Sequence, residues 1–385
     1  MLRPCYNCRM RNLLVSILVL LVPFLLPFLL PFHAKAEEES IKLESIKLGA
    51  MLHLTGEFAL QGEAFRRGVE LAEQTINADG GINGKKLKIV YEDTQYKPLQ
   101  SNTAAKKLSA SKEVLGNVIS TLTETKAAAN VIEKNLLPSI VLWDSSPELD
   151  QTGEYIFSIG PWAPSSGEKA AEFAVNNLKA QSAVVINVQT EWSVYVSEYF
   201  EKHFIALGGK VLKTISVDPN DQDFRTVILK AKSLNPGVIY APIDSNILAF
   251  FKQINTYSIK IPLITSDILD KELFDAGKDI FEGIYQTQSA NPEFPETKKM
   301  VEVYKLKFKQ EPDYLMYTSW GYDGIRILAE AIKRVGPDRK KIKDEIYKIQ
   351  GFQGASGIIS FSQNGSAPRE VNVFKVDGRK LVAAK

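Results

Sequence analysis

Cysteine is almost missing from this chain of 385 residues. Its two cysteines, Cys5 and Cys8, both lie near the N-terminus. The remainder of the sequence therefore offers no thiol for a disulfide, a zinc-thiolate site or nucleophilic catalysis. Histidine is scarce as well, with three residues in all, which excludes a histidine-rich metal centre. We accordingly expect no metal and no cofactor.

Short motifs of catalysis are also missing. The sequence has no G-x-S-x-G, no H-E-x-x-H and no phosphate-binding loop of the G-x-x-x-x-G-K-S/T type. We therefore predict that the protein is not an enzyme. The alternative that this leaves open is a pair of carboxylates, such as Asp144 and Asp267, acting as acid and base.

The charge balance shows no large excess of either sign. The formal net charge is +2. Residues 1–36 contain four basic residues and no acid, and without them 43 basic and 45 acidic residues remain, a net charge of −2. Such a chain gives no electrostatic reason to expect binding to nucleic acid.

Residues 1–36 have the layout of a secretory signal peptide. Two arginines precede an apolar run over residues 13–32, and Ala34-Lys35-Ala36 matches the small-x-small cleavage pattern. We predict cleavage before Glu37 and a periplasmic protein. A retained membrane anchor is the alternative, although three prolines within the run argue against a stable spanning helix. Met10 is a second possible start, because it heads a more ordinary signal.

The stretch over residues 114–149 organises the rest of the chain. Apolar runs at 114–119 and 139–143 predict two strands, and residues 127–134 predict a helix between them. Because parallel strands end at the same edge of a sheet, the hydroxyl groups that follow both strands should lie together. These belong to Ser120, Thr121, Thr123, Thr125, Ser145 and Ser146. The hydroxyls either cap helices or form an anion site at a helix start.

Alternation of strands and helices occurs in two separate runs, one on each side of Gly160. This pattern predicts an α/β fold with two lobes, each a parallel sheet flanked by helices. Helices are also expected at 64–78 and 322–335. Residues 358–361 and 371–376 read as two strands of a hairpin whose turn contains Asn364-Gly365.

Several short segments in a fixed order resemble a known family. The segments are Ile-Lys-Leu-Gly-Ala-Met at 46–51, Leu-Thr-Gly-Glu-Phe-Ala at 54–59, Ile-Asn-Ala-Asp-Gly-Gly at 76–81, Ser-Ser-Pro-Glu-Leu at 145–149, Thr-Ser-Asp at 265–267 and Gly-Tyr-Asp-Gly at 321–324. Together they resemble the periplasmic solute-binding proteins of the leucine/isoleucine/valine type (type I fold), which serve ABC importers. The likeness extends from about residue 46 to the C-terminus.

The resemblance implies a hinged, two-lobe clamp that captures a small ligand without chemistry. It places three chain crossings, near Gly160-Pro161, near 289–292 and near 354–357, as a three-stranded hinge. The first lobe would consist of residues 46–160 plus 291–356. The second would consist of residues 161–290 plus 357–385.

The resemblance also implies how an amino-acid ligand would be held. Ser145 and one of Ser120, Thr121 and Thr123 would receive the ligand carboxylate. Asp267 would receive the ligand ammonium, and the alternative is that Asp267 caps the next helix. Further lining positions are Gln61, Trp192, Ile243 and Tyr317, of which the aromatics are equally compatible with core packing.

Two residues depart from the family pattern. Trp143 and Asp144 stand where many relatives have small residues, so they would line and reshape the ligand site and add negative charge to it. A smaller, a cationic or a non-amino-acid organic ligand fits as well as a branched-chain amino acid. His53 and Trp320 are expected in the core or at the surface.

The expected function is therefore capture of a small solute and its delivery to the permease of an ABC importer, by a monomer. The alternative is a ligand-binding sensor module for a membrane receptor, which would have the same fold and the same site.

Overall fold

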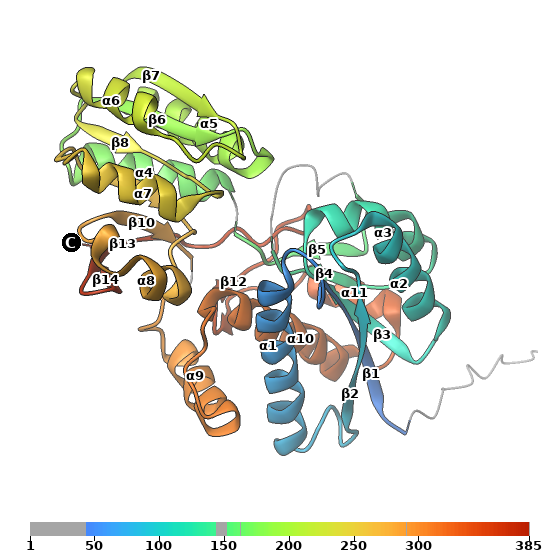
Figure 1. Cartoon of the computed structure of the whole chain (residues 1–385). Coiled ribbons are helices and arrows are strands. Elements are labelled where there is room, and N and C mark those ends of the chain that lie inside the picture. Colours follow the sequence, from blue (N-terminus) through green and yellow to red (C-terminus); the bar gives the residue numbers. More distant parts are fainter. Residues whose placement is uncertain (1–43, 144–151, 162, 290, 385) are drawn as a thin grey trace, which may run out of the picture. The chain divides into compact units, whose positions relative to one another are not determined.

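A computed structural model describes residues 44–143, 152–161, 163–289 and 291–384 (Figure 1). These residues form two large sheets, each flanked by helices, and one small two-stranded sheet. In the part of the chain so described, no helix is long and apolar enough to cross a membrane.

The first sheet has five strands, all parallel, in the order β2-β1-β3-β4-β5. The strands are β1 (Ile46–Leu52), β2 (Leu87–Asp93), β3 (Val114–Ile119), β4 (Ser139–Val141) and β5 (Ile156–Ser158). All six residues of β3 are buried, as expected for a central strand covered on both faces.

Helices cover both faces of the first sheet (Figure 1). On one face, α1 (Ala59–Ala78) and α10 (Leu315–Val335) contribute Phe65, Val69 and Leu328 to a buried core. A second core on the other face is built with α2 (Pro98–Ala110) and α3 (Leu122–Lys134). The remaining helices of this half are α9 (Pro295–Phe308) and α11 (Arg339–Ile346).

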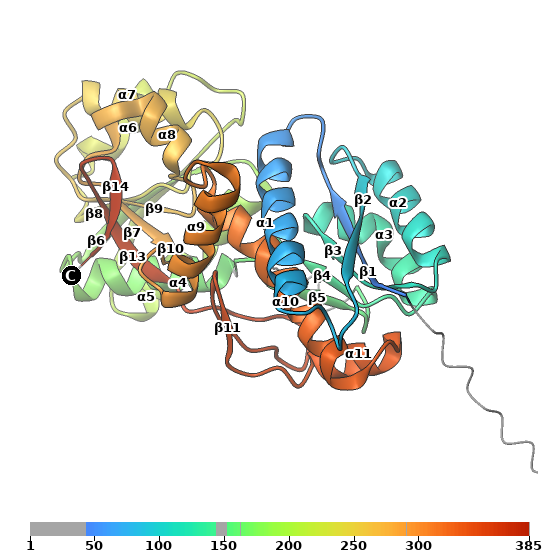
Figure 2. The ribbon, with the colours of Figure 1, turned by 90° about the horizontal axis from the view of Figure 1, so that it is seen from below.

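The second sheet has seven strands in the order β14-β13-β10-β9-β8-β6-β7 (Figure 2). Five are parallel, namely β6 (Ser182–Val188), β7 (Lys210–Val217), β8 (Val238–Tyr240), β9 (Leu263–Ser266) and β10 (Tyr285–Gln288). At the edge, β13 (Asn372–Asp377) runs antiparallel to β10 and to β14 (Lys380–Ala383). This sheet is therefore mixed, whereas we predicted a parallel one.

Two cores lie on opposite faces of the second sheet. One is formed with α4 (Ala163–Asn176) and α5 (Glu191–Ala206). The other is formed with α6 (Arg225–Ser233), α7 (Ile247–Thr256), α8 (Lys271–Gly277) and the short 3₁₀ helix η4 (Lys278–Phe281).

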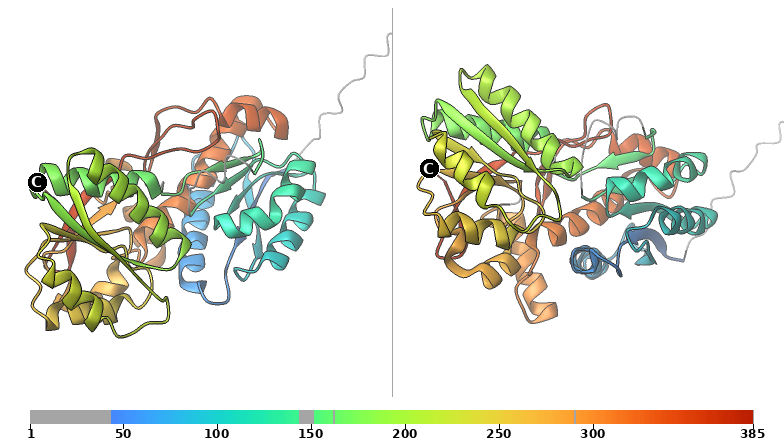
Figure 3. Two further views of the ribbon diagram at one scale, coloured as in Figure 1. Left: turned by 90° about the horizontal axis from the view of Figure 1, so that it is seen from above. Right: turned by 45° about the horizontal axis from the view of Figure 1, so that its top comes forward.

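The chain crosses between the sheets after β5, after β10 and before β13 (Figure 3). The third crossing comes later than the predicted one near 354–357. Ile359, Phe361 and Ala367 all belong to the core of the first sheet. In addition, Ala367 N–H donates to the carbonyl of Ser158 at 2.9 Å, which ties this segment to β5.

The hairpin predicted between 358–361 and 371–376 is wrong. Strands β11 (Phe352–Gly354) and β12 (Gly357–Ile359) pair with each other instead. The buried carboxylate of Asp323, on α10, fixes their turn by accepting the backbone N–H groups of Ala355 at 2.9 Å and Ser356 at 2.8 Å. The sequence pattern at 371–376 is that of β13, which pairs with β10 across the second sheet.

Candidate functional site

The hydroxyl groups that follow β3 are used mainly inside the protein. Thr121 is the N-cap of α3, where its Oγ1 accepts the backbone N–H of Glu124 at 3.3 Å. The same hydroxyl donates to Oε2 of Glu124 at 2.8 Å. This T-x-x-E arrangement satisfies donors at the start of the helix, so the capping interpretation is correct for Thr121.

Ser120 has a structural role as well. Its Oγ donates to the carbonyl of Met51 at 3.3 Å and accepts the backbone N–H of His53 at the same distance. Thr123, by contrast, is exposed. The first turn of α3 has backbone N–H groups without partners inside the helix. Of the three predicted hydroxyls, Thr123 is therefore the one that is exposed beside those N–H groups.

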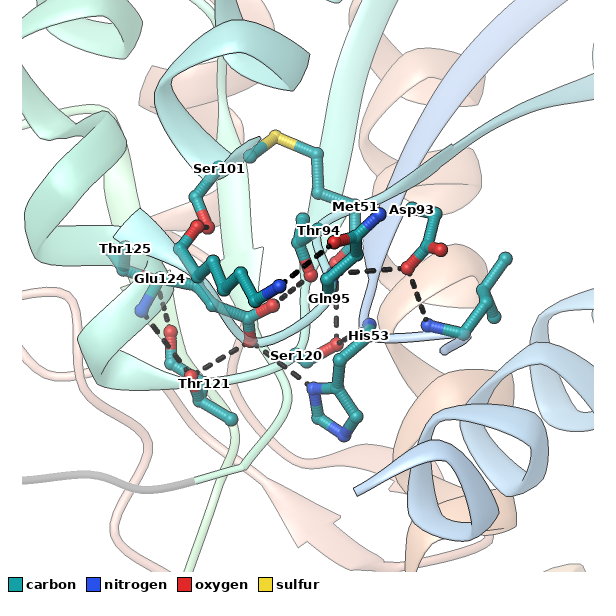
Figure 4. Close-up of polar contacts among 12 residues, drawn as sticks. Met51, His53, Asp93, Thr94, Gln95, Ser101, Ser120, Thr121, Glu124 and Thr125 are labelled. Atoms are coloured by element: carbon teal, nitrogen blue, oxygen red, sulfur yellow. Dashed lines mark hydrogen bonds and ion pairs between the residues drawn. The ribbon is translucent and has the colours of Figure 1, made fainter. Parts of the chain in front are cut away.

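A buried polar network that the sequence did not predict lies directly behind these hydroxyls (Figure 4). Glu124 is fully buried, and its carboxylate is contacted by the Thr94 hydroxyl and by His53 Nδ1 at 3.3 Å. His53 Nε2 is enclosed and lacks a hydrogen-bond partner in the described residues. The only sign of this network in the sequence is a histidine placed at the end of the first strand.

Aromatic rings surround His53 at this edge of the first sheet. The ring centroids of Phe58, Tyr96 and Trp143 lie 5.8–6.3 Å from that of His53. Trp143 also packs edge-on against Tyr317, with centroids 5.0 Å apart. Each of these four rings belongs to a partly exposed residue, whereas Trp320 is buried.

Of the remaining predicted residues of the first half, one is described by the structure and two are not. Gln61, on α1, is partly exposed. Asp144 and Ser145 lie outside the described residues. The structure thus brings Trp143 and Tyr317 together with the hydroxyls that follow β3 at one edge of the sheet.

Asp267 lies directly after β9, at the carboxyl end of that strand. Its backbone N–H donates to the carbonyl of Thr287 at 2.9 Å, and its φ of +47° is left-handed, which is uncommon for a residue other than glycine. The expected alternative, that Asp267 caps the next helix, is not what the structure shows. Asp270 is the N-cap of α8, and its side chain accepts the Leu273 N–H at 2.9 Å.

The two carboxylate oxygens of Asp267 differ in environment. Oδ2 accepts the Ser166 hydroxyl at 2.8 Å. Oδ1 is enclosed and makes no hydrogen bond of normal geometry within the described residues. Burial raises the pKa of Asp267 to about 7, and the Ser166 hydroxyl and the Ser289 backbone N–H offset part of the rise. A group with this environment would gain from a positively charged partner.

The other two predicted residues of the second half have different surroundings. Trp192, in the first turn of α5, is partly exposed and packs against the core on the α4–α5 face. Ile243 is fully buried in the opposite core, beside α7.

Asp244 is a second acidic residue at this edge, and we did not predict it. Its Oδ2 accepts the hydroxyl of Thr190, the N-cap of α5, while Oδ1 is enclosed and unpaired in the described residues. Burial raises the pKa of this carboxyl group too. Asp244 follows the eighth strand much as Asp267 follows the ninth, which is the signal that could have identified it.

Metal binding has no support in the described ranges, which contain no group of three or more histidine, cysteine, aspartate or glutamate side chains suited to hold an ion.

Comparison with protein families indicates which family the chain resembles. A family model described as periplasmic binding protein matches residues 45–380.

The chain belongs to the periplasmic binding protein family.

Relatives of this periplasmic binding protein are similar over most of their length. A Leu/Ile/Val-binding protein homolog 1 from Brucella abortus (strain 2308) is 24% identical over 326 residues, covering 83% of this chain and 87% of that one. The crystal structure of a leucine binding protein, LivK, from Thermotoga maritima is 29% identical, with a TM-score of 0.76, and covers 88% of this chain and 98% of that one. A solute binding protein of an ABC transporter from R. palustris, in complex with benzoate, has a TM-score of 0.73 at 22% identity, with coverages of 88% and 95%.

These comparisons confirm two predictions about the periplasmic binding protein. Its fold is the two-lobe type I fold, and its family is the one that the short sequence segments resemble. It is a solute-binding protein of the kind that serves ABC transporters, a family that is typically not enzymatic.

Proposed function

We propose that this protein is exported, captures a small organic ligand bearing an amino group between its two lobes, and delivers it to the permease of an ABC importer. The observation that carries the proposal is the Asp267 carboxylate. One oxygen is fixed by Ser166, and the other is enclosed without a hydrogen bond of normal geometry in the described residues. An ammonium group supplies the charge and the N–H donors that such a carboxylate requires.

Three further features support an amine-bearing ligand. Asp267 stands at the carboxyl end of a parallel strand, where ligands bind in open α/β sheets. In the described residues no lysine, arginine or histidine forms an ion pair with it. The relatives named for leucine, isoleucine and valine fit a ligand with an amino group.

The first lobe contributes a different kind of surface. Phe58, Tyr96, Trp143 and Tyr317 are partly exposed aromatics, which favour an apolar or aromatic ligand body, or a cation lying over a ring. The benzoate bound by the R. palustris relative shows that this fold also accepts a ring. Thr123 and the N–H groups at the start of α3 would receive a carboxylate, if the ligand has one.

Export and maturation complete the proposal. The signal peptide over residues 1–36 is removed before Glu37, and the mature chain acts as a monomer in the periplasm. Sequencing the N-terminus of protein from the exported fraction tests this, and an intact residue 13–32 segment in membranes would show a retained anchor instead.

A ligand screen tests the central proposal. The exported protein is melted in the presence of amino acids, amines and small organic acids, since a ligand at a hundredfold excess over its Kd raises the stability by roughly 2.7 kcal/mol. Hits are then titrated by calorimetry with the wild type and with Asp267→Asn. We expect the hits to carry an amino group and to lose affinity in the variant. A set of hits that all lack an amine would contradict the proposal.

Small-angle X-ray scattering tests the clamp with the best hit. A two-lobe protein that closes on its ligand should become more compact at saturation. A scattering profile that stays the same with and without saturating ligand would contradict a closing mechanism.

A further inference from the structure

Asp244 and Asp267 lie at the ends of neighbouring strands of the second sheet. Strands β8 and β9 pair in parallel, with Ile239 opposite Leu263 and Tyr240 opposite Ile264. The pairing continues beyond β8, because Ala241 N–H donates to the carbonyl of Ile264 at 2.8 Å. Asp267 is the first residue after β9, and Asp244 comes four residues after the end of β8. Both carboxylates therefore belong to the same carboxyl edge.

The two carboxylates are held in the same manner. Each accepts one hydroxyl from the beginning of a helix, Thr190 at α5 for Asp244 and Ser166 at α4 for Asp267. In each, the second oxygen is enclosed and makes no hydrogen bond of normal geometry to a described residue. In the described ranges, neither forms an ion pair with a basic side chain. A hydroxyl fixes the orientation of each carboxylate but leaves its charge uncompensated.

A third oxygen without a partner belongs to the next strand. Asn187, near the end of β6, is only 3% exposed, and its Oδ1 has no partner in the described part of the chain. Strand β6 pairs with β8, with Val185 opposite Tyr240, so Asn187 lies beside the segment that leads to Asp244. Three neighbouring strands, β6, β8 and β9, thus have an enclosed acceptor near or shortly after their carboxyl ends.

These acceptors require a ligand that offers both hydrogen-bond donors and positive charge. An enclosed acceptor without a donor is costly. A ligand with several N–H donors and more than one positive charge would supply the missing hydrogen bonds and neutralise both acids. A neutral side chain, such as that of leucine, would leave Asp244 as it is in the free protein.

We propose that Asp244 binds a second cationic group of the ligand, so that the protein selects basic amino acids or diamines over ligands with a single amino group. This rests on the proposed function, because Asp267 takes the first amino group. Asp244 is then the residue that determines specificity, while Thr190 positions it. If Asp244 has only a structural role, it links the loop after β8 to α5 and has no effect on ligand choice.

Calorimetric titration with matched pairs of ligands tests the inference in the wild-type protein. L-Lysine is compared with L-norleucine, which lacks only the second amino group, and cadaverine is compared with pentylamine. We expect at least one ligand with two amino groups to bind tenfold or more tightly than its match with one. If every match with one amino group binds as well as its partner with two, the inference is overturned while the proposed function stands. If none of the four binds and the wider screen finds only ligands without an amine, both fall.

Variants then assign the effect to Asp244. In Asp244→Asn, the preference for the ligand with two amino groups should fall tenfold or more, while affinity for the match with one stays within about threefold. Asp267→Asn should weaken both members of a pair. The control is Asp275→Asn, which removes an exposed carboxylate on α8 whose ion pair is with Lys271. Circular dichroism and melting show whether Asp244→Asn is folded, and the wild-type comparison remains decisive if it is not. An unchanged preference in folded Asp244→Asn would overturn the assignment.

Discussion

A Cβ atom added to Gly68 would lie 2.0 Å from the carbonyl oxygen of Thr318. The two residues lie on α1 and α10, whose packing forms much of the core of the first sheet. Because the obstacle is backbone, it cannot turn aside as a side chain would. Gly321 makes the reciprocal approach, since a Cβ there would lie 2.4 Å from the Phe65 carbonyl oxygen. The two helices therefore pack together at a distance that only glycine permits.

Gly68→Ala should destabilise the protein. Alanine is favoured over glycine in a helix by about 1 kcal/mol, but overpacking a tight core costs typically 1–3 kcal/mol, and here it must separate two helices. Thermal unfolding would show a lower midpoint for this variant. Gln74→Ala, at an exposed position of α1, is the control and should change little. A Gly68→Ala protein at least as stable as the wild type would show that the two helices move apart easily.

Replacing Asp267 should weaken binding of an amine-bearing ligand strongly. Losing one partner of a buried charge pair costs ~2–5 kcal/mol, which corresponds to roughly 30- to 3,000-fold in Kd. Asp267→Asn keeps the shape and one acceptor oxygen, so it should lose less affinity than Asp267→Ala. Both should fold, because the carboxylate lies at the sheet edge and not in a core. Calorimetric titration measures the effect, and wild-type affinity in Asp267→Ala would contradict the assignment.

The pKa of Asp267 has a consequence for stability. Its pKa is about 7 in the folded protein and is ordinarily 3.8, so the folded state holds this proton more tightly than the unfolded state does. The stabilisation is complete below about pH 4 and is lost as the pH rises towards 7, by at most about 4 kcal/mol. Asp267→Asn lacks this titration. The stability of the wild type relative to Asp267→Asn should therefore fall between pH 4 and pH 7 in the absence of ligand.

Unfolding midpoints measured for both proteins across this pH range check the sign. Other carboxylates titrate in both proteins alike, so the difference between the two isolates Asp267. Parallel curves would show that the Asp267 carboxylate is well solvated or already neutralised.

Thr121 and Thr123 should respond differently to removal of the hydroxyl. Thr121→Ala removes the N-cap of α3 and a donor to the buried Glu124, and loss of a cap typically costs about 1 kcal/mol, up to about 2. Thr123→Ala changes an exposed side chain and should alter stability by less than about 0.5 kcal/mol. If the hydroxyl of Thr123 contacts a ligand carboxylate, that variant should lose affinity for carboxylate-bearing ligands only. Melting curves and titrations of the two variants separate the capping role from the binding role.

Much of the fold could be predicted because apolar runs between clear breaks fix the elements. Strand β3 has the predicted bounds, because it is a continuous apolar run limited by polar residues. The predicted starts of the helices were less accurate than the predicted bounds of the strands. The first turn of α3 contains Leu122-Thr123-Glu124, which reads as a polar loop until the cap at Thr121 is known. Helix α10 begins at Leu315, whereas the predicted helix begins at residue 322. The buried aromatics Trp320 and Tyr322 make the start of the helix hard to recognise in the sequence.

The candidate site was predictable only where a strand end carried a recognisable residue. Asp267 became a candidate because the family resemblance coincides with its position after an apolar run. Asp244 also follows a strand, but the hydroxyl of another helix that orients its side chain cannot be read from the sequence. The His53–Glu124 contact joins residues 71 positions apart, and no local pattern reveals such a pair. The third crossing was misplaced for the same reason, since a long-range contact with β5 holds residues up to Ala367 against the first sheet.

The position of α10 and of β13–β14 has a consequence for the order of events during synthesis. The apolar face of α1 is covered by a helix that begins at Leu315, and the edge of β10 is paired with a strand that begins at Asn372. A growing chain therefore exposes the first surface until most of the protein has been made, and the second until almost all of it has been made. Contacts so distant in sequence form slowly, and unpaired edges and apolar surfaces favour aggregation in the meantime. A chaperone that binds the unfinished chain would therefore have two sites to protect, the bare face of α1 until α10 is made and the open edge of β10 until β13 is made.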